Sequence, residues 1–418
     1  MIETIERKRW TIAFLLGVGV LINYFDRVNL SVSHDSLLSE FGISDVTFGF
    51  LLGAYNWTYA ACQLPSGVLL DRFGVRRVGI VSTFIWCIAS FGAAISRGLG
   101  GFFAARFLLG VGEAPTFPAN AKAIGYWFPP EKRSLPTALF DSAAKLGSAI
   151  GVPLIGLLLL RVGWRMSFAA TGLVSFLYFL LFYWVYRDPL SGLAKSRVTT
   201  AGADARRILV SLGHLFKQKK VIGLAIGFGS YNYVFYLFVN WLPVYLSRAL
   251  RIDLAHSFIY TGVPWLVAAG ADLLVGGWLV DGLIHRGWNA DGVRRVVLIS
   301  GTAMGLGILG AAHAHTAVAA LFWVSLSIGG LSAAAPVGWS VPSLIAPGDQ
   351  VGSIGGILNL SNQISGIGAA IITGFLVNGR QSFAAAFAVA AAYLIVGITA
   401  YIVLLGKIET ITLPAEAA

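Results

Sequence analysis

The chain contains twelve long apolar stretches, and these restrict its fold more than any other feature. A helix needs about 20 consecutive, mostly apolar residues to cross a bilayer. Of the 418 residues, 57% are apolar and 12% are charged, whereas soluble domains carry about 25% charged residues. The sequence therefore predicts an all-α membrane protein with twelve transmembrane helices. The stretches cover residues 11–33, 47–70, 78–96, 99–126, 135–160, 165–186, 221–247, 256–280, 294–312, 316–345, 351–378 and 382–406.

The basic residues predict how the chain is oriented. If both termini are cytoplasmic, 20 of the 30 Lys and Arg residues fall on the cytoplasmic side and 6 on the other side. The positive-inside rule describes such an excess. Because the basic residues lie between apolar spans, the net charge of +11 does not require a nucleic-acid partner. We expect a multi-pass protein of the bacterial inner membrane.

An internal repeat divides the chain into two halves. The pattern Gly-x-x-x-Asp, followed by Gly-Val-Arg-Arg, ends the second span of each half, at residues 67–77 and 277–295. Transporters with parallel repeats have this organisation, and their substrate site lies between the halves. We therefore predict two pseudo-symmetric six-helix bundles, 1–190 and 221–418, joined by a cytoplasmic linker, 191–220.

Charged residues inside the spans are the strongest functional signal. An ionisable side chain at the bilayer centre costs roughly 2.5–3.5 kcal/mol, and it normally faces a partner or a wet cavity. Asp26 and Arg27 lie in the first span, and Arg106 and Glu113 lie two helical turns apart in the fourth. One interpretation is a pair of salt bridges that hold helices together. The other is that Asp26 and Glu113 bind and release protons, while Arg27 and Arg106 bind a substrate carboxylate.

Further polar residues in the spans have two interpretations each. Lys145 either binds an anion, or it snorkels or pairs with Asp141 one turn earlier. Asp272 is a mid-membrane acid of the second half without an obvious partner in the sequence. Amide and aromatic groups of the second half either bind substrate hydroxyls or pack helices together. They include Asn232, Trp339, Asn359, Asn362 and Gln363.

Motifs for other chemistry are missing from the sequence. It has no P-loop, no H-E-x-x-H and no G-x-S-x-G. A G-x-G-x-x-G pattern at 305–310 lies inside an apolar span rather than after a strand, which argues against a dinucleotide site. We expect no enzyme activity, no metal site and no cofactor, with protons as the coupling ion.

The order of motifs resembles the major facilitator superfamily, and within it the anion:cation symporter family of galactonate, glucarate and hexuronate transporters. The resemblance covers nearly the whole chain. It rests on Asn23-Tyr-Phe-Asp-Arg-Val-Asn-Leu-Ser31, Gln63-Leu-Pro-Ser-Gly67 running into Asp71-Arg-Phe-Gly74, Arg106-Phe-Leu-Leu-Gly-Val-Gly-Glu-Ala-Pro-Thr-Phe-Pro-Ala-Asn120, Trp127-Phe-Pro129 and Gly355-Gly-Ile-Leu-Asn359.

The resemblance implies roles for individual residues. Asp26 and Glu113 are similar to the proton-binding carboxylates of the family, with Arg27 and Arg106 as their partners. The sugar-acid site implied by the family includes Tyr24, Tyr59, Trp339 and Asn359, and the cytoplasmic gating motif includes Asp71, Arg72 and Arg76.

The fifth span departs from the pattern of the family. Sugar-acid members often carry an amide near the middle of this span, where this chain reads Ala143-Ala144-Lys145. The additional lysine would suit a dicarboxylate such as an aldarate, or an aromatic acid.

Together these observations predict a proton-coupled symporter that imports a small organic anion by alternating access, most simply a sugar acid such as an aldonate, aldarate or hexuronate. We expect it to function as a monomer in the lipid bilayer. The alternatives are an importer of an aromatic or other carboxylate, an anion exchanger, a drug/proton antiporter and a transporter-like sensor. An antiporter for cationic drugs would favour an acidic cavity with few arginines, and a sensor would carry an added signalling domain.

Overall fold

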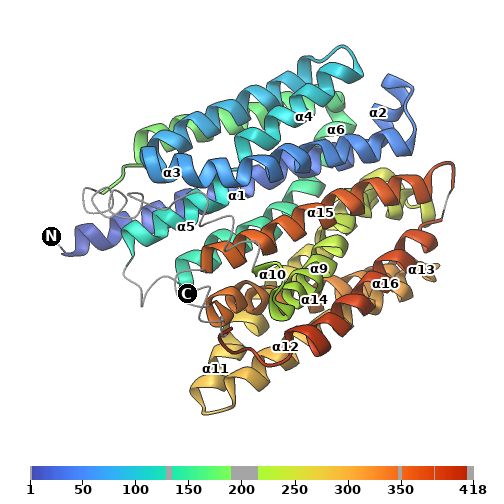
Figure 1. Ribbon diagram of the computed structural model, residues 1–418. Helices are drawn as coiled ribbons and strands as arrows, with labels where there is room; N and C mark the ends of the chain where they lie inside the picture. Colours follow the sequence, from blue (N-terminus) through green and yellow to red (C-terminus); the bar gives the residue numbers. More distant parts are fainter. Residues whose placement is uncertain (1, 129–133, 190–214, 347–350, 381, 412–418) are drawn as a thin grey trace. The chain divides into compact units, whose positions relative to one another are not determined.

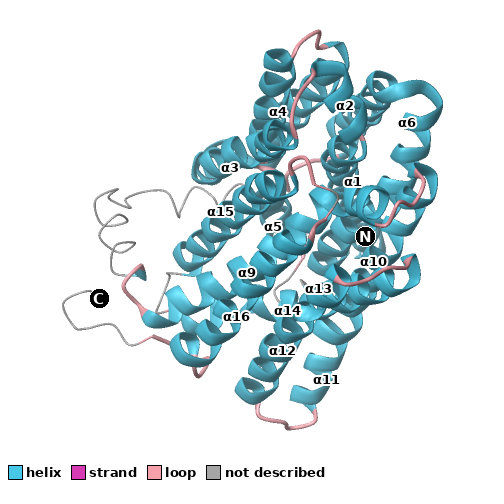
Figure 2. Ribbon diagram, turned by 90° about the vertical axis from the view of Figure 1, so that its right-hand side faces the viewer, coloured by secondary structure: helices cyan, strands magenta, loops and turns pink. Residues whose placement is uncertain are grey.

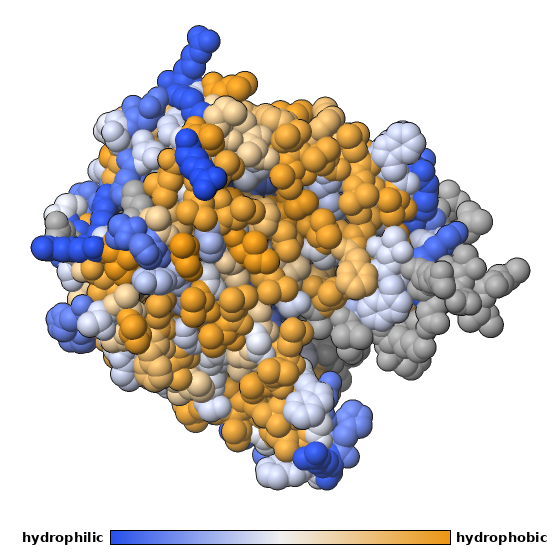
Figure 3. Space-filling model, turned by 180° about the vertical axis from the view of Figure 1, so that it is seen from behind, coloured by the Kyte–Doolittle hydropathy of each residue, from blue (hydrophilic) through white to orange (hydrophobic). Residues whose placement is uncertain are grey.

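The computed structural model describes residues 2–128, 134–189, 215–346, 351–380 and 382–411. Within these ranges every regular element is helical (Figure 2). Helices satisfy their own main-chain hydrogen bonds, which a bilayer requires of any spanning segment. The face of the protein in Figure 3 is covered mostly by apolar side chains, with hydrophilic residues gathered towards its edges. Such a surface suits contact with lipid.

The chain divides into two compact units. The first comprises Met1–Gly202 with Leu254–Gly262, and the second comprises Ala203–Asp253 with Val263–Ala418. Most of the predicted linker, 191–220, lies outside the described residues, so the predicted bundle boundaries stay a prediction.

The first unit contains the helices from α1 to α6, coloured blue to green in Figure 1. Two of them are far longer than one membrane crossing, and each turns back on itself at a glycine. Gly74 has φ 79° and ψ 169° and Gly163 has φ 80° and ψ 168°, a conformation that only glycine adopts readily. Each long helix therefore supplies two spans. The elements are α1 (Ile2–Val32), α2 (His34–Phe41), α3 (Asp45–Ile95), α4 (Leu99–Glu113), α5 (Thr116–Trp127) and α6 (Ser134–Val185).

The second unit contains the helices from α9 to α16, of which α10 begins in the segment that groups with the first unit. Several spans change helix type along their length. The elements are α9 (Lys219–Val244) with η2 (Tyr245–Ala249), α10 (Leu254–Ala271) with η3 (Asp272–Leu279) and α11 (Val280–His285), α12 (Ala290–Met304) with η4 (Gly305–Gly307) and α13 (Ile308–Ala312), α14 (Ala317–Ile345), α15 (Val351–Val377), and α16 (Ala384–Ala400) with η5 (Tyr401–Leu405).

The length and hydropathy of the helices agree with a membrane protein. In the described part of the chain, nine helices are long and apolar enough to cross a membrane, or ten if α2 and the start of α3 form one bent span. One of the nine, Leu139–Val185, has 47 residues and turns at Gly163, so it is long enough for two crossings. The α4 and α5 helices are each short, because Ala114 and Pro115 interrupt the helical segment between them.

Two glycines in α4 let both halves of α3 pack closely against α4. A β-carbon on Gly112 would lie 2.6 Å from the main-chain nitrogen of Trp86, and one on Gly110 would collide with Thr58 and the carbonyl of Tyr55. Small residues at helix contacts have this effect in membrane proteins. The close approach places the end of α4 next to the main chain of Trp86.

We expect Gly112→Ala to destabilise the protein, because the added methyl group has no space beside the main chain of Trp86. Overpacking of this kind costs about 1–3 kcal/mol, which thermal unfolding of the purified protein in detergent would detect. The control is Gly100→Ala in the same helix, where nothing lies within 4 Å of the added carbon. Equal unfolding temperatures for the two variants would contradict the packing argument.

Candidate functional site

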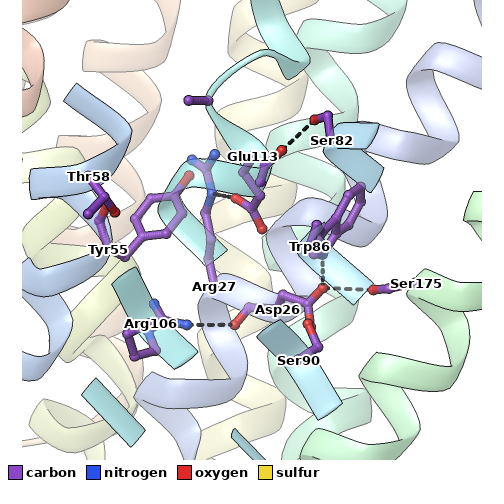
Figure 4. Close-up of polar contacts among 12 residues, drawn as sticks. Asp26, Arg27, Tyr55, Thr58, Ser82, Trp86, Ser90, Arg106, Glu113 and Ser175 are labelled. Atoms are coloured by element: carbon purple, nitrogen blue, oxygen red, sulfur yellow. Dashed lines mark hydrogen bonds and ion pairs between the residues drawn. The ribbon is translucent and has the colours of Figure 1, made fainter. Parts of the chain in front are cut away.

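A buried ion pair joins α1 to the end of α4 in the first unit. Arg27 donates from Nε to Oε2 of Glu113 at 3.0 Å, and the two side chains are 6% and 0% exposed. Figure 4 shows the carboxylate of Glu113 beside the guanidinium of Arg27. Removing two charges from water costs several kcal/mol per ion, and only good geometry offsets that cost. Stability is therefore a weak reason for this pair to exist.

Three tyrosines surround the guanidinium of Arg27. Its central carbon lies 4.6 Å from the ring centre of Tyr24, 4.8 Å from that of Tyr55 and 5.4 Å from that of Tyr59. Arg106 also lies over Tyr55, at 5.5 Å. Aromatic faces attract cations, most strongly where water is excluded. The predicted site residues Arg27, Tyr24, Tyr59 and Arg106 are thus brought together in one cluster.

Asp26 binds a different set of groups from its neighbour Arg27. Its carboxylate accepts hydrogen bonds from Ser90 and Ser175, each at 2.9 Å, and from the indole N–H of Trp86. These donors come from the second half of α3 and the second half of α6, and all are neutral (Figure 4). Asp26 is 2% exposed, so the protein surrounds this acid with hydroxyl and indole donors.

The expected pairing of Asp26 with an arginine is wrong. Arg106 instead donates to the main-chain oxygen of Asp26, at 3.5 Å. Consecutive helical residues point about 100° apart, so Asp26 and Arg27 face different neighbours although they are adjacent in the chain. Only Glu113 has the predicted arginine partner, and that partner comes from another helix.

The sequence prediction omitted several residues that contact these charges. They are Tyr55, Trp86, Ser90 and Ser175. A weak signal existed for two pairs, because Tyr55 and Tyr59 lie one turn apart, as do Trp86 and Ser90. A serine or an aromatic residue in an apolar span is common, however, so spacing alone does not single these out.

Lys145 forms an ion pair within α6. Its Nζ lies 2.7 Å from Oδ2 of Asp141, one turn earlier, and the two side chains are 4% and 28% exposed. This contact is the pairing that the sequence offered as one interpretation of Lys145. A role in binding an anion stays a prediction.

The polar residues predicted in the second unit lie on three of its helices. Asn232 in α9 donates to the carbonyl oxygen of Phe228 at 3.1 Å, and Trp339 in α14 packs edge-on against the ring of Phe228. Trp339 is 45% exposed. In α15, Asn359 is half-buried, and Asn362 and Gln363 are buried. Contact of these residues with a substrate stays a prediction.

The predicted gating residues lie around the turn at Gly74. The side chain of Asp71 is outside the described part of the structure, and Arg72 is exposed with its guanidinium beside Phe73. Arg76 donates from Nε to the carbonyl oxygen of Tyr186 at 3.2 Å. Arg76 thus connects the middle of α3 to the end of α6, and its gating role stays a prediction.

Comparison with known proteins identifies the family to which the chain belongs. Residues 16–288 match the Major Facilitator Superfamily, and the chain belongs to this family of transporters, so it is not an enzyme. Its fold is similar to the crystal structure of a bacterial homologue of the human lysosomal transporter Spinster, with a TM-score of 0.77, 16% identity, and coverage of 95% of this chain and 97% of that chain. The predicted two-bundle major facilitator fold is confirmed.

Some relatives of the chain are named as transporters of sugar acids. The chain is 36% identical to the uncharacterized transporter YybO of Bacillus subtilis, over 97% of this chain and 96% of the relative. It is 30% identical to the probable galactarate/D-glucarate transporter GudP of B. subtilis, covering 98% and 94%, and 28% identical to the D-galactonate transporter of Escherichia coli, covering 97% of each. These relatives agree with the resemblance to the anion:cation symporter family.

Two variants would measure how far the charges of the ion pair depend on each other for stability. Arg27→Met should lower the free energy of unfolding by about 3–5 kcal/mol, because it leaves Glu113 buried without its ion-pair partner. The double variant Arg27→Met, Glu113→Leu should recover most of that stability, since apolar side chains of similar volume replace both charges. Thermal unfolding in detergent measures both. If the double variant is no more stable than Arg27→Met, the two charges do not depend on each other.

Proposed function

We propose that this transporter imports a small organic anion, most simply a sugar acid, together with protons. The observation that carries the proposal is the buried Arg27–Glu113 pair beside Asp26, an acid held by neutral donors. Relatives named for galactonate, galactarate and glucarate support the substrate class. We further propose that the protein works as a monomer in a bacterial inner membrane, with both termini cytoplasmic and no cofactor besides the proton.

The ion pair offers a route to coupling. A proton on Glu113 removes its negative charge, and the guanidinium of Arg27 can then bind the carboxylate of a substrate instead. Loss of that proton restores the Arg27–Glu113 pair and displaces the substrate. Proton and substrate therefore favour each other's binding, and such coupling is reciprocal. Exchange of one partner for another is how a buried salt bridge can act as a switch.

Asp26 is the second proton site of the proposal, and its protonation depends on different partners from those of Glu113. Because its partners are Trp86, Ser90 and Ser175, it can gain or lose a proton without breaking an ion pair. Arg106 binds its main-chain oxygen, which links the helix segment carrying Asp26 to the second cation of the cluster. Proton binding at Asp26 would thereby influence how the cations are presented to a carboxylate.

Proton movement can be tested with external pH in lightly buffered, energy-depleted cells that express the protein. Galactonate, glucarate, glucuronate, phthalate and a neutral sugar are added in turn. We expect alkalinisation with one or more acids and none with the neutral sugar. Asp26→Asn and Glu113→Gln should abolish the signal, whereas Glu40→Gln, which removes a surface acid paired with Arg165, should retain it.

Accumulation of a radiolabelled acid in energised cells gives a pH dependence. Each proton carried adds about 1.4 kcal/mol per unit of pH gradient, a tenfold change in accumulation, so accumulation should fall as external pH rises. Full gradient-driven uptake in both Asp26→Asn and Glu113→Gln would remove these acids from the mechanism. Uptake without any pH response in the unaltered protein would favour an anion exchanger.

Lys145 is expected to influence which acid is preferred. If its ammonium binds a second carboxylate, Lys145→Met should lower glucarate uptake by about tenfold, the value of roughly 1.4 kcal/mol of lost interaction, and leave galactonate uptake within threefold. Competition between radiolabelled acids measures the ratio. Asp141→Asn is the control, because it disrupts the pair and keeps the cation. An unchanged preference in Lys145→Met would assign the lysine to packing within α6.

A further inference from the structure

Three arginines from two distant segments line one cavity in the second unit. The cavity has a volume of about 490 Å³, and Arg248, Arg251 and Arg380 line it together with Ser247, Ile252 and Gly379. Arg248 lies in the last turn of the short helix η2, Arg251 follows that helix, and Arg380 follows α15. None of the described residues that line this cavity is acidic.

The main chain holds both segments in defined turns. The N–H of Ile252 donates to the carbonyl of Leu246 at 3.3 Å, and that of Arg380 donates to the carbonyl of Val377 at 2.9 Å. Arg251 has φ 54°, the single positive value at a described residue other than glycine. A β-carbon makes this conformation unfavourable, and such backbone strain persists where the surrounding structure fixes it, often at ligand sites.

The charged residues that the structure describes in the lining of this cavity are all basic. Arg27 faces Glu113, and Arg165 faces Glu40 at 2.7 Å. Arg251 and Arg380, which come from distant segments, instead line the same space, where like charges repel one another. A bound anion would relieve that repulsion, and guanidinium groups bind carboxylates and phosphates through paired hydrogen bonds.

We propose that this cavity, the arginine pocket, binds a small soluble organic anion through its carboxylate. The volume falls within the range of small-ligand sites, about 300–1,000 Å³. The phosphate of a lipid has similar oxyanion chemistry, but a lipid also needs an apolar surface for its acyl chains. Ile252 is the one aliphatic side chain among the described residues of this lining, so the lining favours a free acid.

The position of the arginine pocket gives the bound anion a role. By the positive-inside distribution, its three arginines belong to the six basic residues of the outer side. The pocket would then gather substrate from outside before transport, since clustered charge raises the local concentration and the association rate of an opposite charge. This role rests on the proposed import of an organic anion, whereas binding itself does not.

Binding is tested residue by residue with phenylglyoxal, which modifies exposed arginines. The purified full chain is placed in phosphatidylcholine nanodiscs and labelled with and without glucarate or galactonate, and each arginine is followed by peptide mass spectrometry. We expect either acid to slow labelling of Arg251 and Arg380 at least about threefold, as oxyanion pairing should. Labelling of Arg97 and Arg161, exposed arginines of the first unit, should not change.

Two labelling outcomes would contradict the binding of an organic acid in the arginine pocket. One is equal labelling of Arg251 and Arg380 with and without acid. The other is protection that occurs only when phosphatidylglycerol replaces phosphatidylcholine and no acid is present, which would make this a lipid headgroup site.

Transport kinetics test the capture role. Arg251→Gln with Arg380→Gln should raise KM about threefold to tenfold and leave kcat within twofold, because local concentration is lost and the transport step is not. Arg97→Gln with Arg161→Gln removes the same charge outside the pocket and should leave KM unchanged. A loss of kcat with unchanged KM would overturn the capture role. Protection of the pocket in a protein that transports no acid would instead contradict the proposed function alone.

Discussion

The cost of burying charge in a low-dielectric interior controls the arrangement of the first unit. Glu113 is fully buried, and Arg27 reaches it from another helix at 3.0 Å. Either charge buried there without a partner would destabilise the protein. The end of α4 that carries Glu113 packs closely against α3, and Gly110 and Gly112 make this possible because a larger residue at either position would collide with α3. Small residues and buried charges are thus parts of one constraint.

Two acids in the same cluster are stabilised in different ways. Glu113 depends on a cation, whereas Asp26 depends on two hydroxyls and an indole N–H. An acid that depends on a cation responds when an anionic ligand competes for that cation. An acid held by neutral donors responds chiefly to the supply of protons. A transporter that couples protons to an anion can use both kinds of response, and the contrast therefore supports the proposed function.

Sequence reasoning found the charged members of the cluster because ionisable residues stand out in apolar spans. It assigned Asp26 the wrong partner because the position of a residue along its own span does not say which helix lies opposite. Trp86, Ser90, Ser175 and Tyr55 were missed for a related reason. Such residues occur in many spans, and only the helices packed against Asp26 and Arg27 make these four distinctive.

The sequence by itself determined the number of spans, the orientation that its basic residues favour, the repeat and the family, because each follows from local hydropathy or from residues close together in the chain. Tertiary structure decided which groups meet. It paired Arg27 with Glu113 and Lys145 with Asp141, and it surrounded Asp26 with neutral donors. It also placed Arg251 and Arg380, which lie far apart in the sequence, in the lining of one pocket. The physical reason is that each step along a helix turns a side chain by about 100°. Its neighbours are therefore set by how helices rotate and pack against one another.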